Sequence, residues 1–186
     1  MESQRVTELL KRPIIVGVGR DARTDHVVRL GLALGKRLDV PVEFVHGLRM
    51  TDVKLPVEKI LGTHLDTLSK ETKLSRQLHV MSASPGYALV HRAKARDAGL
   101  ILLGPHRRRG LMDLGRSARA VLTHAPCAVW VQPEPFLEPK RLIVPVDLSE
   151  EGRLAIDVAV VLARAFGAKL HLMPAFIPPG FAYAAI

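Results

Sequence analysis

The residues best suited to chemistry lie in one basic, glycine-containing segment near the middle of the chain. From residue 104 to residue 117 it reads GPHRRRGLMDLGRS. Arginine binds phosphate through paired N–H groups, and glycine lets backbone N–H groups approach an anion closely. A helix that begins after such a loop adds partial positive charge. The segment predicts binding of a phosphate or another small anion through Arg107, Arg108, Arg109 and Arg116.

An alternative interpretation treats the same segment as a solvated basic loop. Arg107 and Arg116 are bulky, and their side chains would then block the close backbone approach that glycine allows. The sequence alone leaves both interpretations open.

The elements that must position this loop follow from an alternation of apolar runs and amphipathic stretches. Expected strands cover residues 14–18, 42–45, 78–81, 100–103 and 128–131. Leucines and valines at helical spacing predict a helix with Val27, Leu30, Leu34 and Leu38 on one side, and further helices at 58–74, 86–98 and 117–124. On the second of these, Ile60, Leu61, Leu65 and Leu68 are expected on one apolar side. The pattern predicts an α/β fold, an open five-stranded parallel sheet with helices on both faces.

The pattern then restarts. Prolines at 133, 135 and 139 indicate a stiff linker over residues 133–140. Residues 142–146 match residues 14–18 at an offset of 128, and the match continues through a helix and a second strand. We therefore expect a domain at 1–132 and a partial second copy at 141–186. Three elements cannot close such a core alone, so we expect a fragment of a longer tandem protein or, as the alternative, a half-domain that packs on the first domain or on a partner.

Composition narrows the class of protein. The net charge is +9, which favours anionic partners, and only 4% of residues are aromatic. No apolar run is long enough to span a membrane, and no signal peptide opens the chain. Cys127 is the single cysteine, so we expect a cytoplasmic protein. The thiol of Cys127 is expected to be buried and inert. The histidines lack metal-binding spacing and are expected at surfaces or strand ends. No catalytic triad, P-loop or carboxylate pair occurs, so neither a metal site nor an enzyme is predicted.

Residues 100–131, LILLGPHRRRGLMDLGRSARAVLTHAPCAVWV, carry a family resemblance. An apolar strand, a glycine loop, a Gly-Ser helix start and a HAPC ending are similar to the signature of the universal stress protein family. The resemblance covers residues 13–132 and part of a second copy at 141–186, which is the tandem-domain type. It implies a Rossmann-like fold of the adenine-nucleotide alpha-hydrolase kind, in which the loop wraps the phosphates of ATP.

The chain departs from the ATP-binding pattern of that family. Arg107 and Arg116 stand where glycines belong, the loop is one residue short, and Gly19 replaces the aspartate that usually ends the first strand. The resemblance therefore implies a degenerate nucleotide site, made of Gly17, Val18, Leu103, Gly104, His106, Arg107, Gly110, Gly115, Arg116 and Ser117. The second copy keeps remnants of the opening motif at Pro145, Val146, Asp147 and Ser149. Ser149 is also a suitable helix N-cap.

The resemblance implies a regulatory stress protein that acts by dimerisation and by binding a partner or small anion. The dimer strand would be Ala128, Val129, Trp130 and Val131, in a homodimer or in a pseudo-dimer within one chain. No cofactor is firmly implied, with ATP or AMP as the candidates. Alternatives are an ATP- or AMP-binding switch and a soluble regulatory module of a transporter or sensor kinase. A membrane is not expected as a partner. Nucleic acid is not expected either, because the loop has no stacking aromatics nearby.

Overall fold

The computed structural model of the protein describes residues 11–20, 24–48, 56–69, 77–104, 115–132, 137–147 and 149–174. The chain divides into two compact units, the first ending at Leu137 and the second beginning at Glu138. Each unit is described by itself. No helix among the described residues is long and apolar enough to cross a membrane.

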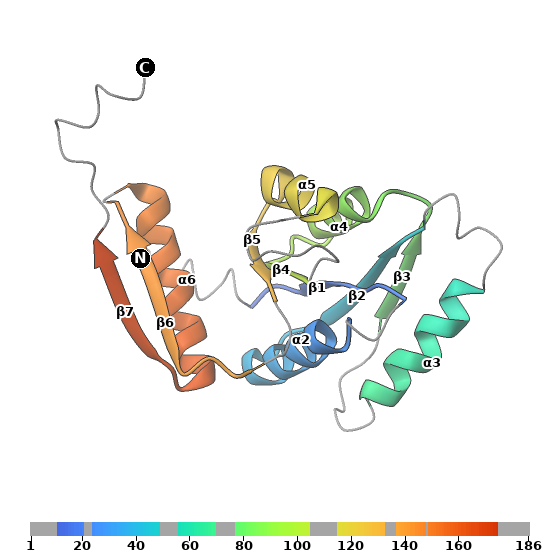
Figure 1. Ribbon diagram of the computed structural model, residues 1–186, viewed down its shortest axis with the longest axis horizontal. Helices are drawn as coiled ribbons and strands as arrows, with labels where there is room; N and C mark the ends of the chain where they lie inside the picture. Colours follow the sequence, from blue (N-terminus) through green and yellow to red (C-terminus); the bar gives the residue numbers. More distant parts are fainter. Residues whose placement is uncertain are drawn as a thin grey trace, which may run out of the picture. The chain divides into compact units, whose positions relative to one another are not determined.

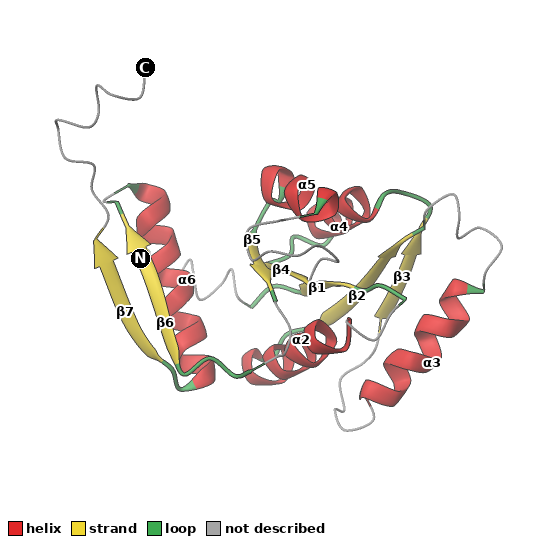
Figure 2. Ribbon diagram, in the orientation of Figure 1, coloured by secondary structure: helices red, strands yellow, loops and turns green. Residues whose placement is uncertain are grey.

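The first unit alternates strands and helices (Figure 1), and Figure 2 shows the same alternation by type of element. Its strands are β1 (Ile14–Gly17), β2 (Val42–Gly47), β3 (Gln77–Met81), β4 (Leu100–Leu103) and β5 (Ala128–Val131). Its helices are α2 (Asp25–Leu38), α3 (Val57–Ser69), α4 (Pro85–Ala95) and α5 (Arg116–His124). The strands form one parallel sheet in the order β3-β2-β1-β4-β5. The predicted α/β fold is confirmed.

Helices cover both faces of this sheet, with α2 and α3 on one face and α4 and α5 on the other (Figure 1). The two central strands β1 and β4 are aliphatic along their length, as strands buried on both faces must be. Burying each such side chain stabilises the fold by about 1.5–3 kcal/mol. The largest side chains with almost no exposure are Phe44, Ile14, Ile15, Leu30, Leu34, Leu61, Leu65, Leu100, Ile101 and Leu102.

Two sequence-based expectations for helices are wrong in detail. Helix α4 ends at Ala95 and not at 98, because Asp97 adopts a left-handed backbone conformation with φ of 49°. Helix α3 begins at Val57, and its apolar side is narrower than expected: Leu61 is buried, whereas Ile60 is 46% exposed. The expected last turn of α3, residues 70–74, lies outside the described residues.

The second unit contains β6 (Arg141–Val146), α6 (Glu150–Phe166) and β7 (Lys169–Pro174). The four residue pairs of the parallel β1–β2 ladder recur 128 residues later between β6 and β7. Thus Ile14 pairs with Val42, and Leu142 pairs with Leu170. The sequence offset and the strand register therefore agree residue for residue.

The ends of the two corresponding helices also agree. Asp39 after α2 and Gly167 after α6 are 128 residues apart, and both are left-handed, with φ of 55° and 62°. Val40 N donates to a carbonyl oxygen of the preceding helix at 3.0 Å, and Ala168 N makes the corresponding bond at 2.8 Å. A left-handed residue after the last helical turn satisfies carbonyls that have no partner within the helix. Local sequence thus ends both helices in the same way.

Candidate functional site

The carboxyl edge of the first sheet contains a topological switch point. β1 and β4 are neighbours, but the chain leaves β1 toward β2 on one side and leaves β4 toward β5 on the other. In open α/β sheets, ligands bind in the crevice outside such a point. Gly17, Val18 and Gly19 end β1 there, and Leu103 and Gly104 end β4.

The end of β1 is closed by the chain's own groups. Val18 N donates to Val45 O at 3.0 Å and so extends the ladder with β2 by one residue. Gly19 N donates to Thr24 Oγ1 at 3.0 Å, and the Thr24 side chain is buried. The backbone N–H that follows β1 is therefore already bonded to a side chain.

His46, on β2 beside this strand end, has one ring nitrogen without a partner. Its Nδ1 lies 2.8 Å from Val18 O, and because a carbonyl only accepts, Nδ1 must carry the proton. Nε2 is then an acceptor in the neutral ring, and it is buried with no hydrogen-bond partner in the described structure. A buried polar atom of this kind is uncommon and often marks a functional position. His46 lies near the end of β2, as the sequence predicted for a histidine at a strand end, and its side chain is buried.

The end of β4 and the start of α5 lie beside the segment that the structure does not describe. Among the described residues, a Cβ on Gly104 would meet the side chain of Val27 at 3.4 Å, which is ordinary contact. Gly115 is the N-cap of α5 and, having no side chain, provides no side-chain cap for the first N–H groups of this helix. Arg116 is exposed in the first turn and Ser117 follows it. The predicted site residues His106, Arg107 and Gly110 lie outside the described residues.

The corresponding strand end in the second unit is arranged differently. Asp147 Oδ1 accepts hydrogen bonds from Ser149 N at 3.1 Å and from Ser149 Oγ at 2.5 Å. These bonds lower the pKa of Asp147 below its usual value. Ser149 Oγ in turn accepts from Gly152 N at 3.0 Å, so Ser149 caps α6 as predicted. Pro145 and Val146 are the last two residues of β6.

The two strand ends differ by a reciprocal exchange of side chains. At the 128-residue offset Gly19 corresponds to Asp147, and Thr24 corresponds to Gly152. A Cβ on Gly152 would lie 3.5 Å from Asp147 N and only 2.7 Å from Asp147 Oδ1. In the first unit the Thr24 hydroxyl takes the same place beside Gly19 N. In the second unit the carboxylate of Asp147 therefore leaves no space for a side chain at position 152, and in the first unit a glycine stands opposite Thr24.

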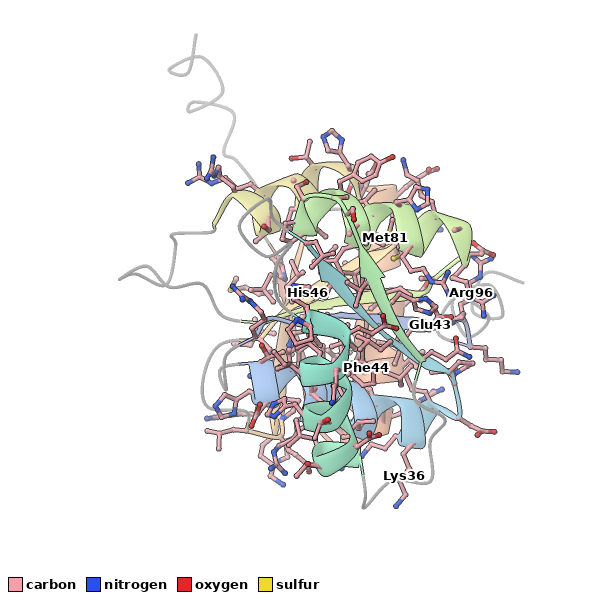
Figure 3. All side chains as sticks on the ribbon, turned by 90° about the vertical axis from the view of Figure 1, so that its right-hand side faces the viewer. Lys36, Glu43, Phe44, His46, Met81 and Arg96 are labelled. Carbon is pink, nitrogen blue, oxygen red and sulfur yellow. The ribbon has the colours of Figure 1, made fainter. Side chains whose placement is uncertain are left out.

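An ion cluster that the sequence did not reveal lies away from this edge, near the amino end of β2. Glu43 is 0% exposed and accepts from Arg92 Nε at 2.6 Å and from Arg96 Nε at 2.7 Å. Figure 3 shows Arg96 reaching the Glu43 carboxylate. Burial would raise the pKa of Glu43, but the two arginines outweigh it and hold this pKa below its usual value. The alternation of β2 gives no hint of a carboxylate at a core position.

His79 on β3 completes the cluster. Its Nε2 lies 2.8 Å from Arg92 Nη2 and 3.4 Å from the Glu43 carboxylate. Because arginine only donates, Nε2 must be unprotonated and the ring neutral. Burial, and then the charge of Arg92, lower the pKa of His79. These contacts bind α4 to β2 and β3, which makes the cluster structural.

The remaining predicted residues lie on and beside β5. Each residue of β5 is partly buried, and β5 pairs only with β4, so its other edge has no partner strand in the described sheet. Cys127, just before β5, is partly buried, and burial raises the pKa of its thiol to about 11. A thiol with this pKa is not a nucleophile at neutral pH. Among the described residues no group of three His, Cys, Asp or Glu side chains lies close enough to hold a metal ion.

Solved structures share this fold. A universal stress protein from Archaeoglobus fulgidus is 23% identical, with a TM-score of 0.54 over 64% of this chain and 92% of that one. A universal stress protein solved in complex with cAMP is 16% identical, with a TM-score of 0.56 over 67% of this chain and 98% of that one. A protein of unknown function from Pseudomonas aeruginosa PAO1 is 17% identical, with a TM-score of 0.72 over 96% of this chain and 65% of that one.

No curated protein matches the chain. The family model described as "Universal stress protein family" matches residues 11–133, which is more than half of the sequence and contains the whole five-stranded sheet. The chain belongs to the universal stress protein family.

Proposed function

We propose that this protein is a regulatory binding protein of the universal stress type, without catalytic chemistry, that holds an adenine nucleotide at the carboxyl edge of its first unit. The phosphates would lie against the start of α5 and Arg116. The observation that carries this proposal is the N-terminus of α5, whose first turn has no side-chain cap and no acidic residue, and begins with an exposed arginine. Such a helix start favours a bound anion.

The position of that helix start supports the proposal. Because α5 leads back into the parallel strand β5, its first turn lies at the carboxyl edge, where β4 ends at Leu103 and Gly104 follows. Among the described residues, the nearest side chain to a Cβ on Gly104 belongs to Val27 at 3.4 Å, and a glycine at this point favours close approach of a ligand to the backbone. Two relatives of the same fold were solved with adenine nucleotides, one with cAMP and one with dAMP. Those ligands indicate the class of compound to test here.

The way this site would hold the nucleotide differs from the family's usual arrangement. Thr24 bonds Gly19 N and fills the place of a first-strand carboxylate, so no acid from β1 reaches the ligand. We therefore propose that affinity comes from the phosphate side, through Arg116 and the backbone of α5, more than from the base or ribose.

Isothermal titration calorimetry with AMP and ATP tests this function. We expect measurable binding to the wild-type chain and about tenfold or greater weakening in Arg116→Gln, which removes a charge-assisted hydrogen bond. Lys36→Gln is the matched control, because Lys36 is an exposed base in the last turn of α2 at the opposite edge. Absence of binding to the wild type would refute the proposal. Tighter binding in Arg116→Gln would show instead that the arginine blocks the pocket.

The open edge of β5 supports a second proposal, a homodimer formed by pairing of two β5 strands. Gln132 N donates to Leu103 O, so by the alternation of a strand the N–H groups of Val129 and Val131 point to the open edge. Val129→Pro removes one of these donors without losing a bond to β4, and a proline is tolerated at such an edge position.

Sedimentation velocity would measure the result. We expect a dimer in the wild type and a monomer in Val129→Pro. The matched control is Val80→Pro on β3, the opposite edge strand. Met81 O accepts from Leu48 N, so Val80 N–H points away from β2. A wild-type monomer, or equal loss of the dimer in both variants, would rule out the β5 interface.

The second unit supports a proposal about domain organisation. We propose that residues 141–186 correspond to the opening strand, helix and strand of a second domain of the same family, joined by the linker at 133–140. Support comes from the 128-residue offset that strand register and helix end share. A regulatory role within a transporter or sensor kinase stays an alternative, and a longer reading frame with apolar runs of about 20 residues would favour it.

A further inference from the structure

We propose that the outer face of helices α4 and α5 binds single-stranded nucleic acid. This face, called the α4–α5 face below, is defined by the exposed residues Tyr87, His91 and Lys94 on α4 and Arg119 and His124 on α5. Three features support the proposal: the charge of the two helices, an exposed pair of rings, and the close packing of one helix on the other. None of them depends on the nucleotide site proposed above.

Charge sets these two helices apart from the others. Neither α4 (PGYALVHRAKA) nor α5 (RSARAVLTH) contains an aspartate or glutamate. In contrast α2, α3 and α6 each carry acidic residues, among them Asp25, Glu58 and Glu150. Residues 72–133 hold ten Lys and Arg against two acids, Asp97 and Asp113, in a chain with a net charge of +9. Of these ten, Arg92 and Arg96 pair with Glu43, and the positive charge on the face itself comes from Lys94 and Arg119, which suits a polyanion.

The face also carries an aromatic platform. Tyr87 is 61% exposed, and its ring stacks on the His91 ring, one helical turn away, with centroids 5.7 Å apart and an interplanar angle of 24°. An exposed ring in a basic surface accepts an unpaired base by stacking. In a duplex the bases already stack on one another and are not available, so the rings favour a single strand over a duplex or an acidic protein.

Close packing brings this platform to α5. A Cβ on Gly86 would lie 3.0 Å from Ala120 Cβ and 3.1 Å from Ser117 O, so the absence of a side chain lets the first turns of α4 and α5 touch. Figure 1 shows the two helices together on one face of the sheet. Tyr87 follows Gly86 directly and therefore lies near α5, which carries Arg116 and Arg119. The sequence-based expectation against nucleic acid considered the basic loop alone, from which Tyr87 is distant in sequence.

Fluorescence anisotropy with labelled oligouridylate and oligothymidylate of about 20 nucleotides tests the proposal on the full chain. We expect binding that weakens as salt increases. Tyr87→Ala should weaken it about tenfold, whereas Tyr87→Phe, which keeps the ring, should stay within about twofold of wild type. Lys94→Gln should reduce the slope of log affinity against log salt by about 0.7, the value for one phosphate contact of a single strand.

Control variants separate binding at the α4–α5 face from binding to any other basic surface of the protein. Lys36→Gln, an exposed base on α2, should leave the affinity within about twofold of wild type, and circular dichroism should show that every variant is folded. Oligothymidylate weaker than oligouridylate would still support the face and identify RNA as the preferred strand. Four results would overturn the proposal: no binding of either strand, a duplex or polyglutamate bound as tightly as the single strands, no loss in Tyr87→Ala, or complete release of the oligonucleotide by ATP.

Discussion

The β1–α2–β2 segment of the first unit and the β6–α6–β7 segment of the second have the same strand register but different surroundings. Ile15 is fully buried, whereas Ile143 at the corresponding position is 67% exposed. Val45 is buried, and the corresponding Met173 is 52% exposed. In the first unit α4 packs on this face of the sheet, and no helix among residues 138–174 does the same for the second. Local sequence thus sets register and helix ends, whereas burial depends on the elements that follow.

The strand ends show the same division. The first unit has Gly19 and Thr24 where the second has Asp147 and Gly152. In each unit, the residue that carries a side chain lies beside a glycine at the other position. The first unit therefore presents a hydroxyl bonded to a backbone N–H, and the second a carboxylate bonded to Ser149. Of the two strand ends, that of the second unit carries the carboxylate that the resemblance implies, Asp147, and that of the first unit carries Gly19.

The largest expected effect concerns Glu43 and its counterpart His171. Glu43→Gln removes the charge between Arg92 and Arg96, and we expect a loss of about 3 kcal/mol in the free energy of unfolding, because two partly buried cations lose their common partner. His171 occupies the exposed position of β7 that corresponds to Glu43, so His171→Gln is the matched control. It should change the free energy of unfolding by less than about 0.5 kcal/mol. Urea denaturation measures both. Equal effects would show that burial does not distinguish the two segments.

The exchange at the first strand end gives the next effect. Gly19→Asp forces a carboxylate against the Thr24 side chain, and we expect a loss of about 2 kcal/mol. Adding Thr24→Gly should recover most of it, because it removes the side chain that the new carboxylate meets. Thermal unfolding of the single and double variants measures the coupling. Additive losses would mean that the two positions do not share the same space.

The corresponding experiment in the second unit changes the same two positions, 152 and 147. Gly152→Thr places a Cβ 2.7 Å from Asp147 Oδ1 and should displace the carboxylate, opening the first turn of α6 at a cost of about 1 kcal/mol. Asp147→Gly in the same chain should close the turn again. Hydrogen exchange of the α6 amides reports this turn separately from the first unit. Unchanged exchange in Gly152→Thr would contradict the predicted steric conflict.

The smallest expected effect is a pH dependence of the first unit between pH 7 and pH 5. The pKa of His79 is lowered by burial and by Arg92, so the neutral ring is favoured in the folded state. The neutral His79 ring therefore contributes fully to the free energy of unfolding above its pKa in the unfolded chain, about 6.5, and this contribution is lost as the pH falls below that value. We expect the free energy of unfolding to fall from pH 7 to pH 5, by less in His79→Gln than in wild type. Identical pH profiles would exclude His79 as the source.

Sequence patterns predicted the strands well because buried parallel strands are continuous aliphatic runs. The bounds of β4 and β5 agree with the prediction, and the 128-residue offset anticipated the register of β6 and β7. The surroundings of individual side chains could not be predicted from the sequence. Nothing in a strand pattern shows that Arg92 and Arg96 meet Glu43, that Thr24 bonds Gly19, or that one nitrogen of a buried histidine stays unpaired, because each depends on how the chain folds in three dimensions.

For the candidate site, the sequence predicted where some residues lie in the fold but not what surrounds them. Gly104, Gly115 and Arg116 lie at the carboxyl edge as the resemblance implied, whereas His106, Arg107 and Gly110 fall outside the described residues. Whether a glycine is replaced is visible in a sequence. What fills the resulting space, as Thr24 does, becomes visible only in three dimensions.

An NMR titration of the isotope-labelled full chain with AMP tests the nucleotide site most directly. We predict that amide shifts change at Gly104, Gly115, Arg116 and Ser117 and stay constant at Asp147 and Ser149, because only the first unit combines a switch point with an uncapped helix start. Changes centred on Asp147, or none at any of these residues, would contradict a nucleotide site at the carboxyl edge of the first unit.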